Sequence, residues 1–215
     1  AGGGLPEAPR AIFDCCPSSP LMWSDVTCQN LLDCAEHGIP AEIIPAPQMG
    51  ATSPVTIAGT IVEANAEFLS GAVISQLAAP GAPLVYGGSP SAFDMRHCTA
   101  RLGAVEAVMA ACAFAEMGKR YGVPTHGYLG LSDSKAVDAQ SSYESGMGIL
   151  LAAMARVNVV SGPGMQASEN CQSLEKLVID DELCGAAYRL IDGIRVDEET
   201  LAADVISKVG PGGQI

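Results

Sequence analysis

Three polar side chains, Asp133, Ser134 and Lys135, lie where a predicted strand at residues 125–129 gives way to a loop. A carboxylate can contact a cation, a hydroxyl can make a hydrogen bond, and an amine can form a Schiff base. We expect Asp133 to be catalytic and Ser134 and Lys135 to contact a substrate. Capping of the following helix by Asp133 or Ser134 is an equally good interpretation of the same residues.

The loops after two other predicted strands supply further candidates. Tyr86 ends the apolar run 84–86, and we expect it to be catalytic, with its ring facing a cation. A buried tyrosine with a satisfied hydroxyl is the alternative. Gln48 follows the run 41–44 and is expected to hydrogen-bond a substrate. Asp94 is a substrate-binding candidate too, although a local ion pair with Arg96 explains it as well.

His126 lies inside the predicted strand at residues 125–129. As an imidazolium it can bind a substrate carboxylate, so we count it among the substrate-binding candidates. A hydrogen-bonded core histidine is the alternative. In the Ser161-Gly162-Pro163-Gly164 turn, Gly162 and Gly164 permit close approach of the backbone to a ligand. No G-x-G-x-x-G or Walker pattern accompanies this turn, so nucleotide binding is not expected.

Composition narrows the class of partner. The formal net charge is −13, with 11 Lys and Arg, which disfavours nucleic acid. A cationic substrate or a basic protein partner suits this charge, and mere solubility is the plain alternative. No C-x-x-C occurs, and the three histidines, His37, His97 and His126, are scattered, so no bound metal is expected.

Segment properties indicate a cytoplasmic protein that is not in a membrane. No uninterrupted apolar run of about 18 residues occurs. Residues 1–6 have neither a basic segment nor an apolar signal core, so no export signal is expected. Cys112 and Cys184 lie in apolar helical stretches, where free cysteine behaves as a small hydrophobe, so a reducing compartment and free thiols are expected.

The candidates must be positioned by repeated β-α units. Five short apolar runs, each followed by a polar loop and a helical stretch, predict strands at residues 11–13, 41–44, 84–86, 125–129 and 158–160. Helices are predicted at residues 24–37, 55–77, 103–121, 136–156, 173–194 and 197–209. Strands in such units run parallel, so all five loops emerge at one edge of the sheet. Residues 1–215 are expected to form a single α/β domain.

Several stretches, in order, resemble the trimethylamine methyltransferase superfamily of corrinoid-dependent enzymes. They are EIIPAPQMGATSP at residues 42–54, YGGSP at 86–90, GLSDSK at 130–135, VSGPGM at 160–165 and CQSLEKLVID at 171–180. Any one of them alone, such as Gly-Gly-Ser-Pro, is a weak signal. Their common order over essentially the whole chain makes the resemblance specific.

The resemblance implies a (β/α) TIM-barrel enzyme that demethylates a methylated amine. The methyl group passes to the Co(I) corrinoid of a separate, cognate corrinoid protein, and Gly162 and Gly164 are expected to contact the corrinoid. Family members extend beyond both ends of this chain, so a partial barrel of about five β-α units is implied. Such a portion lacks some substrate-contacting strands unless another chain supplies them. A homo-oligomer is expected.

One departure from the family pattern bears on the substrate. The founding trimethylamine enzymes carry pyrrolysine, which the resemblance places near residues 130–142, and this chain has none. Members without it are thought to act on quaternary amines such as glycine betaine. The resemblance therefore favours a quaternary amine, whose neutral leaving group needs no proton.

Two other functions stay open. The first is a non-catalytic barrel fragment that binds a betaine-like cation or a partner protein without turnover. The second, independent of the resemblance, is a lyase or aldolase that uses Lys135 as a Schiff-base amine. A Schiff-base lysine usually needs a desolvated position, and trapping with borohydride distinguishes this case.

Overall fold

The structure is a computed structural model that describes residues 9–214. The expectation drawn from residues 1–6, that no export signal is present, lies outside the described residues. Residues 211–214 form a turn and irregular backbone.

Five parallel strands follow one another in chain order. β1 (Phe13–Cys15) pairs with β2 (Ala41–Ile43), which pairs with β4 (Leu84–Tyr86). Tyr86 bridges Thr125 in the parallel sense, just before β7 (His126–Gly127), which pairs with β8 (Val159–Val160). The predicted parallel arrangement is thus confirmed, and the loops that follow these strands lie at one edge. Strand order in a doubly wound sheet reverses at one point, whereas here it does not.

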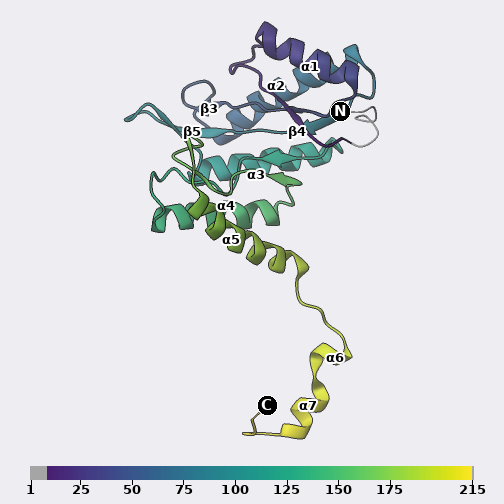
Figure 1. Cartoon of the computed structure of the whole chain (residues 1–215), viewed down its shortest axis with the longest axis vertical. Helices are drawn as coiled ribbons and strands as arrows, with labels where there is room; N and C mark the ends of the chain where they lie inside the picture. Colours follow the sequence, from purple (N-terminus) through teal and green to yellow (C-terminus); the bar gives the residue numbers. More distant parts are fainter. Residues whose placement is uncertain (1–8, 215) are drawn as a thin grey trace.

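A layer of helices covers one face of the strands (Figure 1). It contains α1 (Asp25–His37), α2 (Ile57–Ala78), α3 (Val105–Arg120), α4 (Ala139–Met154) and α5 (Leu174–Asp192), and each packs against the next. The main core lies between this layer and the strands. Cys15, Ile43 and Tyr86 from the strands pack there with Phe68 of α2 and Phe114 of α3.

Capping residues explain where the helices begin. Ser24 Oγ accepts the N–H of Thr27 and starts α1, as predicted, and Gly38 at φ 65° ends it. Ser173 starts α5 in the same way. The capping interpretation of Asp133 and Ser134 is wrong, because α4 begins later, at Ala139, and its cap is Asp138, whose side chain accepts the N–H of Ser141.

The predicted loops contain short strands that the sequence did not indicate. β3 (Gln48–Met49) pairs in parallel with β5 (Ser91–Asp94), which forms an antiparallel hairpin with β6 (Thr99–Arg101). A second small hairpin joins β9 (Met165–Gln166) to β10 (Cys171–Gln172). Both hairpins build up the edge where the loops emerge. β1 also begins two residues later than predicted, so Asp14 is a strand residue.

The C-terminal segment does not form the single helix predicted for residues 197–209. Ala202, at φ 48°, separates α6 (Glu198–Leu201) from α7 (Ala203–Val209). These helices extend away from the packed part of the chain (Figure 1). α2 is the one described helix that is long and apolar enough to cross a membrane, by length and composition alone. In this fold α2 packs between α1 and α3.

Candidate functional site

Alternation along the strands places a second set of side chains on the face opposite the helices. Because Cys15 and Ile43 face the helix layer, their neighbours Asp14 and Glu42 face the other way. We call this surface the interior face. It carries a hydrogen-bonded chain of three residues: Glu42 contacts His126 Nδ1, and His126 Nε2 lies 2.7 Å from Ser161 Oγ. The side chains of Glu42 and His126 are both only 4% exposed.

Gly87 makes the Glu42–His126 contact possible. Gly87 lies between β2 and β7, directly after β4, and a Cβ there would overlap the Glu42 carboxylate. Its missing side chain leaves a gap through which Glu42 reaches across the sheet to His126. Packing therefore explains why the first residue of the Gly-Gly-Ser-Pro stretch, Gly87, is a glycine.

Tyr128 and three acidic residues complete the interior face. The rings of His126 and Tyr128 meet edge to face, with centroids 4.9 Å apart. Burial, and then the nearby carboxylates of Asp14, Glu42 and Glu169, raise the pKa of the Tyr128 phenol above its usual range. Glu169 is an exposed residue overall, but loss of water around its carboxyl group raises its pKa, an effect that His126 opposes.

Cys16 adjoins the same group. Cys16 is an exposed residue overall, but loss of water around its thiol, followed by the carboxylates of Asp14 and Glu42, raises the thiol pKa. A surface with several carboxylates and one aromatic ring can hold a cation through charge attraction and the face of the ring. Across residues 9–214, no group of three or more His, Cys, Asp or Glu side chains is arranged to hold a metal ion.

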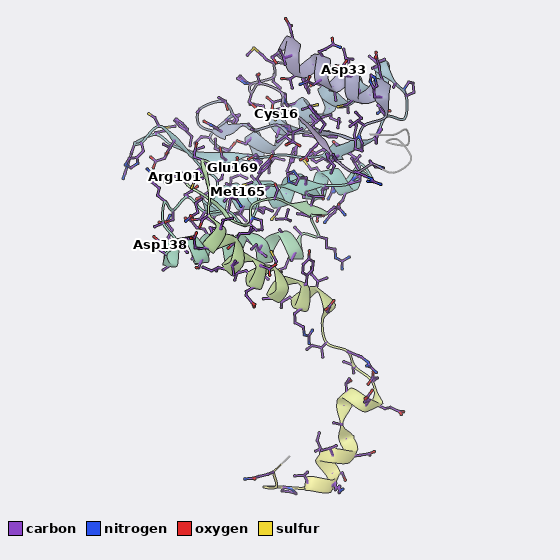
Figure 2. The ribbon with its side chains drawn as sticks, in the orientation of Figure 1. Cys16, Asp33, Arg101, Asp138, Met165 and Glu169 are labelled. Carbon is purple, nitrogen blue, oxygen red and sulfur yellow. The ribbon has the colours of Figure 1, made fainter. Side chains whose placement is uncertain are left out.

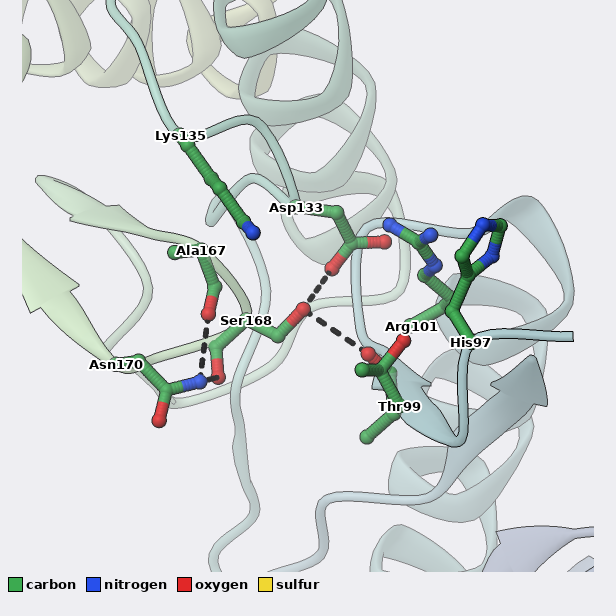
Figure 3. A pocket seen from close by; sticks show the side chains of 9 residues that line it. His97, Thr99, Arg101, Asp133, Lys135, Ala167, Ser168 and Asn170 are labelled. Carbon is green, nitrogen blue, oxygen red and sulfur yellow. Dashed lines mark hydrogen bonds between the residues drawn. The ribbon is translucent and has the colours of Figure 1, made fainter. Parts of the chain in front are cut away.

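A second polar group surrounds a cavity of about 540 Å³ at the edge where the loops emerge (Figure 3). Its walls come from the β5–β6 hairpin, the loop after β7 and the β9–β10 turn. Figure 2 shows Arg101, Met165 and Glu169 at this end of the molecule. The polar side chains that line the cavity are His97, Thr99, Arg101, Asp133, Lys135, Ser168 and Asn170.

Asp133 holds three segments of this cavity together. Its Oδ1 accepts the N–H groups of Leu102 at 3.0 Å and Gly103 at 3.2 Å, and the hydroxyl of Ser168 at 2.6 Å. Figure 3 shows the bond to Ser168, with Lys135 on one side and Arg101 on the other. Asp133 is buried and lines the cavity, and its hydrogen bonds also hold the loops in place.

Asp94 binds within its own hairpin. Its Oδ2 lies 2.9 Å from His97 Nδ1 and 3.1 Å from the Arg101 guanidinium. The alternative of an ion pair with Arg96 is wrong, because only the backbone N–H of Arg96 bonds to this carboxylate. The His97 side chain, and then the Arg96 N–H, hold the pKa of Asp94 far below its usual range.

Tyr86 lies on the helix side of the sheet, away from the interior face. It is fully buried, its ring centroid is 4.1 Å from that of Phe68 and 4.3 Å from that of Phe114, and its hydroxyl donates to Asn65 at 2.7 Å. Burial raises the pKa of Tyr86 above its usual range. This placement supports the alternative of a buried, satisfied tyrosine and not a contact with a substrate.

The other predicted residues are dispersed around the edge. Gln48 starts β3, and its carbonyl accepts the N–H groups of the following turn. Ser134 is buried, and its hydroxyl lies 3.1 Å from an Asp138 carboxylate oxygen. Lys135 is exposed beside the cavity, which does not supply the desolvated amine that a Schiff-base mechanism needs.

The predicted corrinoid-binding glycines pack against the chain itself. A Cβ at Gly162 would overlap the backbone of Leu129, and one at Gly164 would overlap the Gln172 side chain. Packing within the chain therefore accounts for both glycines, and their contact with a corrinoid stays a prediction. The Gly164 N–H donates to Asp180 at 2.7 Å, which fixes the turn on α5.

Sequence reasoning missed most of the interior face. Asp14 was assigned to a loop, Glu42 to an apolar strand, and Tyr128, Ser161 and Glu169 were not singled out. A signal was present: Glu42 is a charged residue inside the buried run Ala-Glu-Ile-Ile. A buried charge needs a partner, so it could have been paired with a strand histidine. Of the predicted residues, the interior face contains His126, and the cavity brings together Asp133 and Lys135.

Similarity to known proteins agrees with this architecture. The chain is 41% identical over 214 residues to a trimethylamine methyltransferase of Methanosarcina barkeri, covering 98% of this chain and 43% of that protein. It is 37% identical to a glycine betaine methyltransferase of Desulfitobacterium hafniense, covering 91% of this chain and 41% of that protein. The chain thus spans less than half the length of these curated relatives.

The fold has a counterpart among solved structures. The Methanosarcina barkeri monomethylamine methyltransferase superposes with a TM-score of 0.60 at 11% identity, covering 90% of this chain and 40% of that one. At this identity the likeness concerns the fold. The family model for trimethylamine methyltransferase matches residues 6–215. The predicted resemblance is thereby confirmed, and the chain belongs to the trimethylamine methyltransferase family.

Proposed function

We propose that this chain is the methylamine-binding portion of a methyltransferase that demethylates a quaternary amine. The acceptor would be the corrinoid of a cognate partner protein. Membership of the family supports the methyltransferase class. The strand order and single helix layer support five consecutive units of a (β/α)₈ barrel, forming one α/β domain. The homo-oligomer and the cytoplasmic location stay predictions.

The interior face carries the proposal. In a barrel this face lines the centre, and here the charges of Asp14, Glu42 and Glu169 all act on the Tyr128 phenol and raise its pKa. Carboxylates and an aromatic face are the groups that bind a methylated ammonium ion, which has no N–H donor for directional hydrogen bonds. The net charge of −13 adds a long-range attraction for the same ion.

This chain would bind and orient the methyl donor. A Co(I) corrinoid, when bound, supplies the nucleophile that accepts a methyl group. The residues of the interior face would desolvate the ammonium ion and aim one methyl group outward. Because a tertiary amine leaves as a neutral molecule, no side chain has to donate a proton. The contact of Gly162 and Gly164 with the corrinoid stays a prediction, because packing within the chain accounts for both glycines.

The cavity at the edge where the loops emerge, which we call the rim cavity, is proposed as the entrance to the interior face. Asp133 and Lys135 line it beside Ser168, and the next residue, Glu169, belongs to the interior face. Asp133, Ser134, Gln48 and Asp94 would then shape the loops around the entrance and not react themselves. The buried or paired side chains of Asp133, Ser134 and Asp94 support this positioning role. Gln48 supports it through its backbone carbonyl, which accepts N–H groups of the following turn.

A calorimetric titration with a matched pair of ligands tests the cation site. Glycine betaine and 3,3-dimethylbutanoate have the same shape and carboxylate, but the second has carbon in place of the charged nitrogen. Glycine betaine should bind at least about tenfold more tightly, which corresponds to about 1.4 kcal/mol. Replacing Tyr128 with leucine should remove about the same factor. Tyr143→Leu is the control, because Tyr143 is an exposed tyrosine on α4.

Methyl transfer is then followed with free cob(I)alamin, whose absorbance changes when it is methylated. Loss of the Co(I) spectrum with glycine betaine, reduced in Tyr128→Leu, supports the enzyme. Tight binding without any spectral change would instead support a non-catalytic, cation-binding chain. Equal affinity for the two ligands would rule out the cation site.

A further inference from the structure

We infer that Ser161 is an activated nucleophile, and that the interior face carries an acyl-transfer activity towards small esters in addition to the proposed methyl transfer. The inference rests on the Glu42–His126–Ser161 chain, which spans β2, β7 and the end of β8. A hydroxyl, an imidazole and a carboxylate in this order are the groups that activate serine in hydrolases on several unrelated folds.

The partners fix how the imidazole is protonated. A carboxylate can only accept a hydrogen bond, so the His126 Nδ1 that contacts Glu42 must carry the proton. The His126 Nε2 lone pair then faces the Ser161 hydroxyl at 2.7 Å, where it can accept the hydroxyl proton. Both the acid and the imidazole are 4% exposed, so water does not compete for these bonds.

The position of Ser161 suits attack on a bound ester. Ser161 directly follows β8 at the end where the loops emerge, and it is half-buried. The N–H of the next residue, Gly162, donates no backbone hydrogen bond within residues 9–214, although Gly162 is buried. A free N–H on the residue after the nucleophile is the group that stabilises the oxyanion in serine hydrolases.

The reaction balances without another reagent. Ser161 Oγ forms a bond to the ester carbonyl carbon while its proton passes to His126 Nε2, and the carbonyl electron pair moves to oxygen. The carbonyl then re-forms, the ester C–O bond breaks, and the leaving alcohol takes the proton from His126. Water attacks the acyl-serine in the same way, giving a carboxylic acid and the free serine. Esters that are neutral or cationic fit best, because the surrounding carboxylates repel anions.

The test uses a fluorophosphonate probe and p-nitrophenyl acetate on the 215-residue chain. We expect mass spectrometry to find the phosphonyl group on Ser161, and p-nitrophenolate release to show a burst. His126→Gln and Glu42→Gln should each slow labelling at least 100-fold. Ser142→Ala is the matched control, because Ser142 is an exposed serine of α4 and should change nothing.

A glycine substitution tests the geometry without touching the three residues. Gly87→Ala should displace the Glu42 carboxylate and slow labelling at least tenfold, because a Cβ there overlaps that group. Gly185→Ala, where a Cβ meets no atom within 4 Å, should leave labelling unchanged. Circular dichroism of each variant shows whether it folds. Ser161→Cys is a second probe that leaves Glu42 and His126 in place. Mass spectrometry should find iodoacetamide on residue 161, at a rate that falls in whichever of Gly87→Ala and Glu42→Gln is folded.

Labelling of a different serine, or a labelling rate unchanged by both His126→Gln and Glu42→Gln, would overturn the inference. The same protein preparations are titrated with glycine betaine. Betaine binding with no Ser161 reactivity refutes the nucleophile and leaves the cation site intact. Ser161 reactivity without betaine binding refutes the cation site and leaves the nucleophile intact.

Discussion

A buried ion pair on α5 offers the sharpest test of how the site is held. Lys176 and Asp180 are 1% and 0% exposed, and they contact each other one helical turn apart. Lys176 Nζ also lies 3.4 Å from the carbonyl oxygen of Gly130, and Asp180 Oδ2 accepts the N–H of Gly164 at 2.7 Å. The pair therefore fastens the loops after β7 and β8 to one helix.

Removing either charge alone should be costly. Lys176→Met leaves a buried carboxylate whose second oxygen, Oδ1, already has no hydrogen-bond partner in the described chain. Asp180→Asn leaves a buried ammonium group beside a neutral amide. Breaking a buried pair in this way costs about 3–5 kcal/mol. The double variant has no unpaired charge, and its asparagine can still accept the Gly164 N–H. It should cost no more than the larger single change, which gives a coupling energy of at least about 3 kcal/mol.

Urea unfolding followed by circular dichroism measures these differences. Each single variant should lower the urea midpoint by roughly 1–2.5 M, taking about 2–3 kcal/mol per molar urea as the slope. The double variant should recover part of that loss. If the two single costs add up in the double variant, the pair contributes no specific coupling, and the account of α5 as the fastener of both loops is wrong.

Two further outcomes follow from the rim residues. Asp133→Ala removes the one charged acceptor that three donors share, so it should lower the free energy of unfolding by about 2–4 kcal/mol. The thermal midpoint should fall by roughly 4–16 °C. Asp181 is exposed, so Asp181→Ala should leave the midpoint unchanged. The pKa of Asp94 is lower in the folded protein than in the unfolded chain, first because of His97. Ionised Asp94 therefore stabilises the fold above about pH 4, and this stabilisation is lost as the pH falls through the folded pKa. The stability difference between wild type and Asp94→Asn should therefore shrink on acidification, and a difference that persists in strong acid would contradict this assignment.

The parallel strands could be predicted because their ends are marked in the sequence. Pro40 and Pro45 flank β2, and Pro83 precedes β4, so these strands have sharp limits. The predicted helices 24–37 and 173–194 each begin at a serine, and in the structure Ser24 and Ser173 cap α1 and α5. The order of the strands in space followed from the repeat of β-α units. These features are local, and a single sequence contains them.

The polar interior face could not be predicted in the same way. Asp14 is an exposed charged residue directly after the predicted strand 11–13, so the sequence places it in a loop. Glu42 is a charged residue inside an otherwise apolar strand, and yet it is buried. The partner of Glu42, His126, is 84 residues away in the chain. Pairings at that distance depend on the register of three strands, which apolar periodicity does not specify.

The acidic composition is explained differently for buried and for exposed residues. Several buried acids hold loops in place: Glu67 accepts the Ser19 hydroxyl and the Leu21 N–H, and Asp133 and Asp180 bind the rim loops. Their charge is used inside the protein, so it says little about a ligand. Asp14 and Glu169 are exposed residues whose side chains hold no loop by a hydrogen bond within residues 9–214, yet the charge of each raises the pKa of Tyr128. The local attraction for a cation therefore depends on these two residues, and the total of −13 adds only the long-range part.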